Sequence, residues 1–490
     1  MTNMLLVMTE EPCELMKRSG LVSPHDRRAS ERWLNEGGHV ASDAVLEREA
    51  ADDARRASTT YDRRATTPDD PGGAKLRQNP DPTALARRAR RRVIIAGGGV
   101  AGLETLLAVH SLAGDRVDIT LVEPELTFVN RSMAVMEPFK GRGARGVRTK
   151  DIAGEFGAHW IRRSLERVSH EERVAVTRDG MELPYDVLVL AVGARRPERP
   201  WPPDGQLPFY DGRDVPDYAL LLRHVRDGRA NKLAFVRPAG ASWPLPIYDL
   251  ALLTAADCAS HGRSAEIELT LITPEQEPLG IFGAPASAAI RGLLDQAGVT
   301  LCTSSFAEPA GHGWLDVTPG HRRLQVDRVV TQSRLVGPRL RGVPCDRDGF
   351  IQTDNQGRVH GIEGVFAAGD ATAFPIKQGG LAAQQADAIA EAIAYAAGAD
   401  ISPQPFRPIL RGTLLTGTAA RYLRADISGT AGDDSIISTE ALWWPPNKLC
   451  GRYLAPYLGR LDDGADVMPQ DEGAIPVDVR LDELADIGSA

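Results

Sequence analysis

The sequence predicts an α/β protein whose parallel strands are covered on both faces. Between residues 91 and 397, short apolar runs alternate with stretches of helical periodicity. The runs are residues 92–96, 117–123, 187–192, 232–236, 266–273 and 365–368. Runs of this length, separated by helices, are typical of parallel strands that are buried on both faces. The second observation is a glycine-rich turn, residues 97–102, directly after the first run.

The composition is that of an ordinary globular protein. The 490 residues are 42% apolar and 25% charged, a length that allows about three domains. A formal net charge of −9 argues against a nucleic-acid partner, which requires a basic surface. No apolar run reaches the roughly 18 residues of a membrane-spanning helix. The cysteines form no CxxC pair, which argues against a disulfide framework or a metal site and suits a reducing cytoplasm; they are Cys13, Cys258, Cys302, Cys345 and Cys450.

The two ends of the chain differ from its centre. Residues 1–90 contain neither Phe nor Ile and are rich in Arg, Asp, Glu, Ala and Thr. Residues 461–490 form an acidic tail. Such segments bury too little apolar surface to offset the entropy lost on ordering. We therefore expect both to be largely disordered.

The glycine-rich turn has the spacing of a dinucleotide-binding motif. Gly97 permits a tight turn after the strand, Gly99 lets the backbone approach a pyrophosphate, and Gly102 allows close packing of helix and strand. Val100 and Ala101 open the helix, whose N-terminus presents free N–H groups to the phosphates. A glycine-rich turn without a ligand is the alternative interpretation.

Glu123 supplies the acidic residue that accompanies this motif. It ends the second predicted strand, where a carboxylate accepts hydrogen bonds from a ribose diol. Strand, turn, helix, strand and acid occur in the expected order, which favours the dinucleotide site over an empty turn.

Two later segments resemble flavoprotein motifs. Residues 183–194, LPYDVLVLAVGA, resemble the "YDxLVxATGA" strand of flavin-dependent pyridine-nucleotide reductases, with Val192 in place of Thr and with Gly193 retained. Residues 364–372, GVFAAGDAT, are similar to their second FAD motif, which implies that Asp370, after Gly369, holds a ribityl hydroxyl. From the residues alone, Asp370 also fits a helix N-cap. The chain thus resembles the FAD-dependent pyridine nucleotide-disulfide oxidoreductase superfamily, which implies noncovalently bound FAD.

This resemblance implies two Rossmann-like dinucleotide-binding domains and a small C-terminal domain. The FAD-binding domain is expected to be discontinuous, formed by residues 91–200 and 321–398. Residues 201–320 form the inserted domain, and residues 399–460 form the C-terminal domain. The segment 1–90 precedes them and the tail 461–490 follows.

The inserted domain departs from the family pattern at its nucleotide turn. After the strand 232–236, only Gly240 remains of the glycine motif, while Pro238, Pro244 and Pro246 lack N–H groups and Trp243 adds bulk. A nicotinamide cofactor is therefore uncertain. Residues 244–249, PLPIYD, resemble the "PxPxYE" turn of sulfide:quinone oxidoreductases. Those enzymes use redox cysteines beside the flavin, but residues 370–385 contain none.

The segment after the second FAD motif contains the candidate catalytic residue. Residues 377–386, KQGGLAAQQA, are similar to the Gln-rich "AQxAxQQ" helix of type II NADH dehydrogenases. The resemblance implies that Lys377 places a cation near flavin N1 or the acceptor carbonyl. Gln384 and Gln385 would line the acceptor pocket, with Tyr248 contributed by the inserted domain. The alternative is that Ala and Gln are simply good helix formers.

The expected function is a FAD-dependent oxidoreductase that passes two electrons from a small donor to a quinone or similar acceptor. One alternative is an NAD(P)H-dependent flavin reductase, with Glu275 as the ribose acid of the inserted domain. A non-catalytic FAD-binding sensor or structural protein is another. The aromatic and basic segment 441–458 suits packing within the chain or a homodimer interface, and secondarily a peripheral contact at the inner face of the membrane.

We predict that deletion of residues 1–88 leaves folding and FAD content intact, because this segment has too few apolar groups to join the core. The check is a comparison of the thermal transition and the bound flavin between truncated and full-length protein. Precipitation of the truncated protein, or loss of its cooperative transition, would contradict the expectation.

Overall fold

The computed structural model describes residues 90–140, 146–196, 206–209, 212–311, 313–332, 334–426, 436–443 and 448–461. Residue contacts divide the chain into two units, Met1–Asn79 and Pro80–Ala490, and the described residues belong to the second. Apart from Arg90 and Leu461, the ends that we expect to be disordered lie outside the described residues.

The first sheet has five parallel strands in the order β18-β9-β1-β2-β5. These are β18 (Val365–Ala367), β9 (Val187–Leu190), β1 (Arg91–Ala96), β2 (Val117–Val122) and β5 (His159–Ile161). In the register of the sheet, Ile95 lies between Leu121 and Val189. Four of its strands precede the second sheet in the sequence, and the fifth, β18, follows it.

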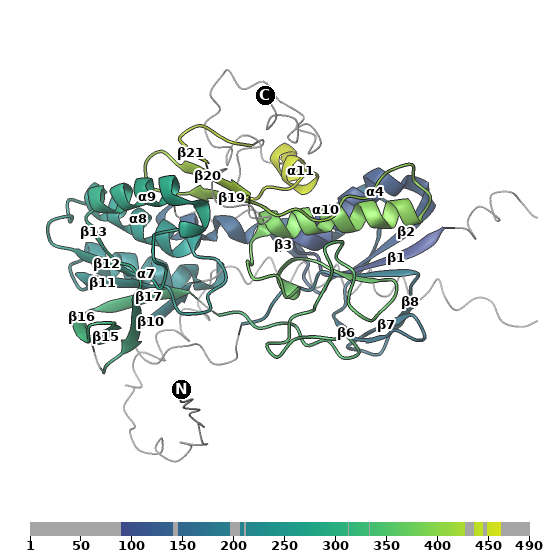
Figure 1. The fold of residues 1–490 in the computed structure, drawn as a ribbon, viewed down its shortest axis with the longest axis horizontal. Helices are drawn as coiled ribbons and strands as arrows, with labels where there is room; N and C mark the ends of the chain where they lie inside the picture. Colours follow the sequence, from purple (N-terminus) through teal and green to yellow (C-terminus); the bar gives the residue numbers. More distant parts are fainter. Residues whose placement is uncertain are drawn as a thin grey trace, which may run out of the picture. The chain divides into compact units, whose positions relative to one another are not determined.

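Alternate residues of β1 point to opposite faces of this sheet, as strand geometry requires. Val93 and Ile95 are buried with the helices α4 (Val100–Ala113) and α10 (Gly379–Ala396). Helices α4 and α10 pack along one another (Figure 1). Ile94 and Ala96 face the other way, toward the antiparallel strands β6 to β8. These strands are β6 (Leu165–Ser169), β7 (Val174–Thr177) and β8 (Glu182–Pro184).

The second sheet repeats this plan with the strand order β10-β17-β11-β12-β13. Its parallel strands are β10 (Gln206–Phe209), β17 (Arg328–Gln332), β11 (Lys232–Val236), β12 (Glu268–Ile272) and β13 (Val299–Cys302). Leu233 and Phe235 share a core with the helices α7 (Val215–Arg226), α8 (Leu245–Ser260) and α9 (Ala284–Gln296). Ala234 and Val236 face the antiparallel strands β14 (Phe306–Pro309), β15 (Trp314–Thr318) and β16 (Arg322–Gln325). The predicted α/β fold with two Rossmann-like units is confirmed.

The C-terminal residues form the antiparallel sheet β19-β20-β21 and the helix α11. The elements are β19 (Ile409–Leu414), β20 (Arg421–Asp426), β21 (Ile436–Ser438) and α11 (Leu454–Leu461). Trp443 packs edge-on against Tyr422, with ring centroids 5.3 Å apart. This contact agrees with packing of the aromatic segment within the chain. Residues 444–447 of that segment lie outside the described residues.

The shorter elements lie in the connections. They are η1 (Gly114–Arg116), β3 (Thr127–Val129), η2 (Arg131–Met136), α5 (Glu137–Lys140), β4 (Gly146–Arg148), α6 (Thr149–Glu155), η3 (Gly212–Asp214), η4 (Gly280–Phe282) and η5 (Gly369–Ala371). Within the described ranges, no helix is long and apolar enough to cross a membrane.

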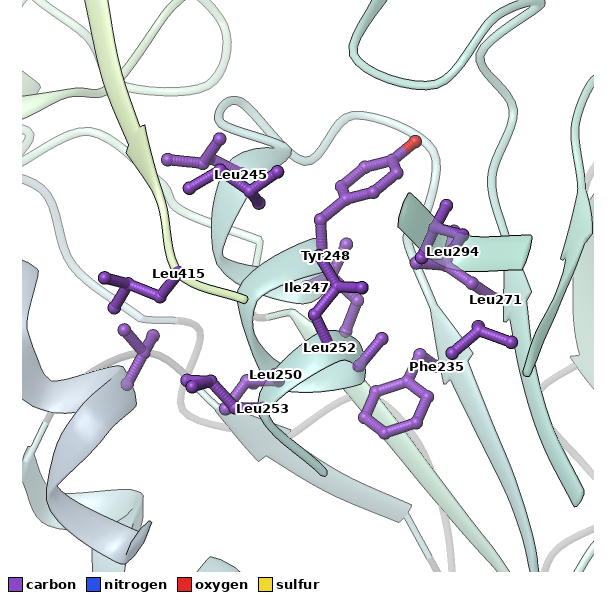
Figure 2. Close-up of a cluster of buried hydrophobic side chains, with 14 of the residues drawn as sticks. Phe235, Leu245, Ile247, Tyr248, Leu250, Leu252, Leu253, Leu271, Leu294 and Leu415 are labelled. Carbon is purple, nitrogen blue, oxygen red and sulfur yellow. The ribbon is translucent and has the colours of Figure 1, made fainter. Parts of the chain in front are cut away.

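Helix α8 links the inserted domain to the C-terminal residues. Its apolar side chains pack on Phe235 and Leu271 of the second sheet, while Leu415, just beyond β19, packs on its other side (Figure 2). Asp249 of α8 is fully buried. It accepts a hydrogen bond from the Leu415 amide at 2.8 Å and forms an ion pair with Lys448. Because a buried charge is costly without a partner, this pair fixes Lys448 on α8.

Candidate functional site

Only glycine fits at the two ends of the turn between β1 and α4. Gly97 has a φ of +110°, and a Cβ there would lie 2.2 Å from the Ala191 carbonyl oxygen. A Cβ on Gly102 would lie 1.8 Å from the Gly97 carbonyl oxygen. A Cβ on Gly99, by contrast, would meet nothing within 4 Å. The turn is therefore tight where it packs against the protein and open at Gly99, where a pyrophosphate would approach.

Helix α4 begins at Val100, and no side chain among the described residues caps it. Gly99, the N-cap residue, supplies its carbonyl oxygen to the Leu103 amide at 2.9 Å. The first-turn N–H groups of Val100, Ala101 and Gly102 thus belong to a helix terminus without a side-chain acceptor. Such a terminus binds anions through these N–H groups and the helix dipole.

Glu123 lies beside this turn at the end of β2. It is nearly buried, and its two carboxylate oxygens accept hydrogen bonds from the amides of Gly98 and, at 2.8 Å, Glu125. Burial raises its pKa above the ordinary value. Sequence reasoning assigned no role to Gly98, yet a Cβ there would lie 2.7 Å from Cγ of Glu123. Only the fold brings these two positions together.

The second FAD motif lies at the carboxyl end of β18, next to the same turn. Gly369 has a φ of +71°, and a Cβ there would lie 3.1 Å from Cβ of Ala101. The Gly369 amide donates to Oε1 of Gln385 at 2.7 Å. Burial raises the pKa of the Asp370 carboxyl, while the positive charges of Lys377 and Arg131 lower it.

The sequence analysis did not single out Arg131, which opens η2. Its positive charge lowers the pKa of both Glu123 and Asp370, the two acids of the predicted FAD site. No spacing rule links position 131 to the glycine motif, so the signal comes from the fold. Gly193, after β9, has a φ of +70° and open space where its Cβ would be.

Lys377 lies in the loop between η5 and α10. Its ammonium group donates to the Thr372 carbonyl oxygen and lies 3.9 Å from the centroid of the Phe350 ring. Burial lowers its pKa to about 8, against the opposing effect of Asp370 and Asp346. The structure therefore brings the predicted cation to the Asp370 motif.

The predicted acceptor-pocket residues take part in hydrogen bonds within the chain. Gln384 exchanges two hydrogen bonds with the Ile409 backbone, at 2.8 and 2.9 Å, and so anchors β19 on α10. Gln385 holds Gly369, as described above. Tyr248 is fully buried in the core around α8 (Figure 2). Its hydroxyl donates to Glu275 at 2.7 Å. Assignment of the three residues to an acceptor pocket stays a prediction, and these contacts favour structural roles for Gln384 and Tyr248.

The four cysteines among the described residues are free thiols that form no disulfide. Cys258 and Cys450 are buried, which raises their pKa values to about 11 and about 12 and disfavours the reactive thiolate. Within the described residues, no group of three or more His, Cys, Asp or Glu side chains is placed to hold a metal ion.

The residues around the first turn fit an FAD molecule. The open approach at Gly99 and the uncapped N-terminus of α4 suit the pyrophosphate, and the acids Glu123 and Asp370 suit the hydroxyl groups of the cofactor. Lys377 adds a cation on the side of α10.

The chain is similar in sequence to a ferredoxin reductase component, and in fold to a sulfide:quinone oxidoreductase and a second ferredoxin reductase. The ferredoxin reductase component of chlorobenzene dioxygenase from Cupriavidus sp. (strain PS12) is 26% identical over 324 residues, which cover 61% of this chain and 73% of that protein. The sulfide:quinone oxidoreductase of Aquifex aeolicus matches with a TM-score of 0.66 and 17% identity over 71% of this chain and 86% of its own. A ferredoxin reductase from Rhodopseudomonas palustris matches with a TM-score of 0.53 and 16% identity, over 69% and 83%.

We predict that Gly99→Val abolishes flavin retention without unfolding the protein. The valine side chain enters open space in the protein itself but occupies the path of the pyrophosphate. The measurement is the flavin-to-protein absorbance ratio, together with the cooperative thermal transition. Gly292→Val on α9, which also meets open space, is the matched control. A fully loaded, yellow Gly99→Val protein would rule out this site.

The match to a protein family covers most of the described chain. Residues 91–392 match the family described as "Pyridine nucleotide-disulphide oxidoreductase". This stretch contains both parallel sheets, the glycine turn and the Asp370 motif. The chain belongs to this family and is an FAD-dependent oxidoreductase.

Proposed function

We propose that this enzyme passes two electrons from a small donor, other than a nicotinamide nucleotide, to a quinone or similar small acceptor. When bound, FAD supplies the two-electron chemistry, with negative charge developing at N1 on reduction. The proposal rests on the difference between the two helix N-termini that follow the central strands of the two sheets, α4 and α8.

The N-terminus of α8 offers few N–H groups to a phosphate. Its N-cap is Pro244 and its second residue is Pro246, neither of which has an N–H group. The amide of Ile247 donates to the Pro244 carbonyl oxygen at 3.2 Å. In α4 the corresponding positions are glycine, valine and alanine, all with N–H groups. This difference is the observation that carries the proposal.

Side chains also occupy the turn that precedes α8. A Cβ on Gly240, the remaining glycine, would lie 3.4 Å from Nε of Arg334. Arg237 donates to the Ala241 carbonyl oxygen at 2.9 Å, and the Trp243 carbonyl oxygen accepts from Gln332 at 2.8 Å. The turn is thus held together by the chain's own hydrogen bonds. Trp243 itself packs against Phe282, with ring centroids 6.0 Å apart.

Glu275, the acidic residue of the inserted domain, already accepts hydrogen bonds from within the chain. Glu275 follows β12 as Glu123 follows β2, and its Oε2 accepts from the hydroxyls of Tyr248 at 2.7 Å and Thr273 at 2.8 Å. A ribose diol would have to compete with these hydrogen bonds. Burial and Glu275 raise the pKa of Tyr248 far above its ordinary value, so its hydroxyl remains a donor.

Lys377 is the residue to which we assign the charge on the flavin side. Its neighbours Thr372 and Phe350 hold the ammonium group beside the Asp370 motif. A cation held there stabilises negative charge that develops on a bound cofactor. At this position beside the Asp370 motif, the same cation would also stabilise negative charge on the oxygen of a quinone acceptor.

An NAD(P)H-dependent reductase with a protein electron carrier as acceptor is the second candidate. The 26% identical relative, a ferredoxin reductase component, favours it. It requires a nucleotide to bind the inserted domain despite the prolines at the start of α8.

We predict that NADH reduces the flavin slowly and without saturation at cellular concentrations, whereas small quinones rapidly reoxidise chemically reduced enzyme. Losing two charge-assisted hydrogen bonds, at about 1.5–3 kcal/mol each, weakens nucleotide binding by roughly two to four powers of ten. Stopped-flow absorbance of the flavin provides the measurement, with NADPH and sulfide as parallel donors. Rapid reduction that saturates at micromolar NADH would replace this proposal with the second candidate.

We predict that Lys377→Met lowers the midpoint potential of the bound flavin at pH 6 by roughly 20–40 mV, equivalent to about 1–2 kcal/mol. Because the pKa of Lys377 is about 8, the wild-type side chain is charged at pH 6 and largely neutral near pH 10. The difference between variant and wild type should therefore shrink at the higher pH. Lys377→Arg keeps the charge and is the control. Equal potentials for Met and wild type at pH 6 would remove Lys377 from the site.

A further inference from the structure

Two carboxyl groups meet between the helices α4 and α10, outside the residues assigned to FAD. Glu104 of α4 is fully buried, and Asp387 of α10 is half-buried, with its Oδ1 atom screened from solvent. A side-chain hydrogen bond between the two groups raises the pKa of Asp387 and lowers that of Glu104, while Oδ1 of Asp387 has no hydrogen-bond partner among the described residues. Two carboxylates only accept hydrogen bonds, so this contact requires a proton on one of them.

Glu104 also holds residues 448–461, which we call the C-terminal strap. Its Oε1 accepts from the Tyr453 amide at 2.7 Å and its Oε2 from the Leu454 amide at 2.8 Å. These are the amides at the start of α11, so the helix is capped by a side chain from α4. A Cβ on Gly451 would lie 2.5 Å from Oε2 of Glu104, so glycine is needed for this close approach.

Apolar contacts place the strap on the flavin-binding helices. Leu449, Leu454 and Tyr457 are buried in the core that α4 and α10 share. Leu449 lies at the start of α10, where a Cβ on Gly379 would be 3.1 Å from its side chain. Leu449 of the strap therefore contacts Gly379, two residues after Lys377.

The charged groups around Glu104 and Asp387 affect the free energy of ionising both carboxyl groups at once. Glu391, one turn further along α10, adds a third negative charge, and Arg452 of the strap pairs with it at 3.7 Å. The charge of Asp387 also acts on the pKa of Arg411 of β19, and the charges of both acids act on that of the Tyr453 hydroxyl. Burial, followed by the charge of Glu104, raises the pKa of Asp387 well above its ordinary value, and Arg452 opposes this effect. Burial likewise raises the pKa of Glu104.

We propose that Glu104 and Asp387 share one proton, and that this proton keeps the C-terminal strap docked on α4 and α10. Loss of the proton to solvent leaves two buried like charges in contact. Undocking of the strap then exposes Glu104 to water and relieves the repulsion.

The direction of the pH dependence follows from linkage. The docked state binds the proton more tightly than the undocked state, in which the carboxyl groups are hydrated and have ordinary pKa values. Docking is therefore strongest at low pH and weakens as pH rises through the pKa of the docked pair. For one proton the equilibrium changes at most tenfold per pH unit.

Amide hydrogen exchange of the full-length protein tests this proposal. Exchange of the Tyr453 and Leu454 amides, corrected for the intrinsic rate at each pH, is followed from about pH 5 to about pH 9. We expect their protection to fall with a slope that approaches tenfold per pH unit, while the amides of β1 show no such trend. Constant protection of the strap over this range would overturn the proposal.

Two variants separate the shared proton from general instability. Asp387→Asn cannot ionise but still donates to Glu104, so its strap should remain protected across the same range. Glu391→Gln removes a neighbouring charge and the partner of Arg452 but not the shared proton, so it should lower the overall protection of the strap and keep the wild-type slope. The same slope in Asp387→Asn as in wild type would overturn the proposal. If Asp387→Asn does not fold, the infrared carbonyl band of a protonated, buried carboxyl group in the wild type decides: its absence at neutral pH would overturn the proposal.

Discussion

The close approach of the chain at Gly97 and Gly102 is the constraint on which the flavin site depends. The tight turn from β1 into α4 brings the backbone so close at these two positions that no side chain fits at either. Glycine at both positions therefore allows the helix to begin directly after the strand. The same turn places the Gly98 amide on Glu123 and the Ala101 side chain against Gly369. Both FAD motifs, distant in the chain, therefore meet at one helix terminus.

The two Rossmann-like units share a plan but differ at the residues that contact a nucleotide. Each has a parallel sheet with helices on one face and a small antiparallel sheet on the other. In the inserted unit, however, prolines replace the glycine turn, Tyr248 engages the acid Glu275, and Asp249 is paired with Lys448. Topology is thus retained while the polar groups of the second site serve internal contacts, which supports a donor other than a nicotinamide nucleotide.

The sequence predicted those features that depend on local spacing. The α/β class, the glycine turn and the Asp370 motif follow from strand-length runs and short motifs that can be located without knowing the fold. Contacts between distant positions could not be predicted in this way. Gly98 depends on where the Glu123 side chain lies, Arg131 on the approach of η2, and Lys448 on a partner 199 residues away. The resemblance to a Gln-rich helix of type II NADH dehydrogenases predicts a pocket role for Gln384, whereas in the structure its amide anchors β19.

The central claim is that the second unit keeps the fold of a nucleotide-binding domain without its affinity. Calorimetric titration of the oxidised, flavin-loaded protein with NAD⁺ tests it most directly, because NAD⁺ cannot reduce the flavin and the heat therefore reports binding alone. We expect a dissociation constant weaker than about 1 mM, that is, a binding free energy weaker than about −4 kcal/mol. A dissociation constant of about 1 μM would contradict the account, because it would show that the proline-containing N-terminus of α8 still binds the nucleotide.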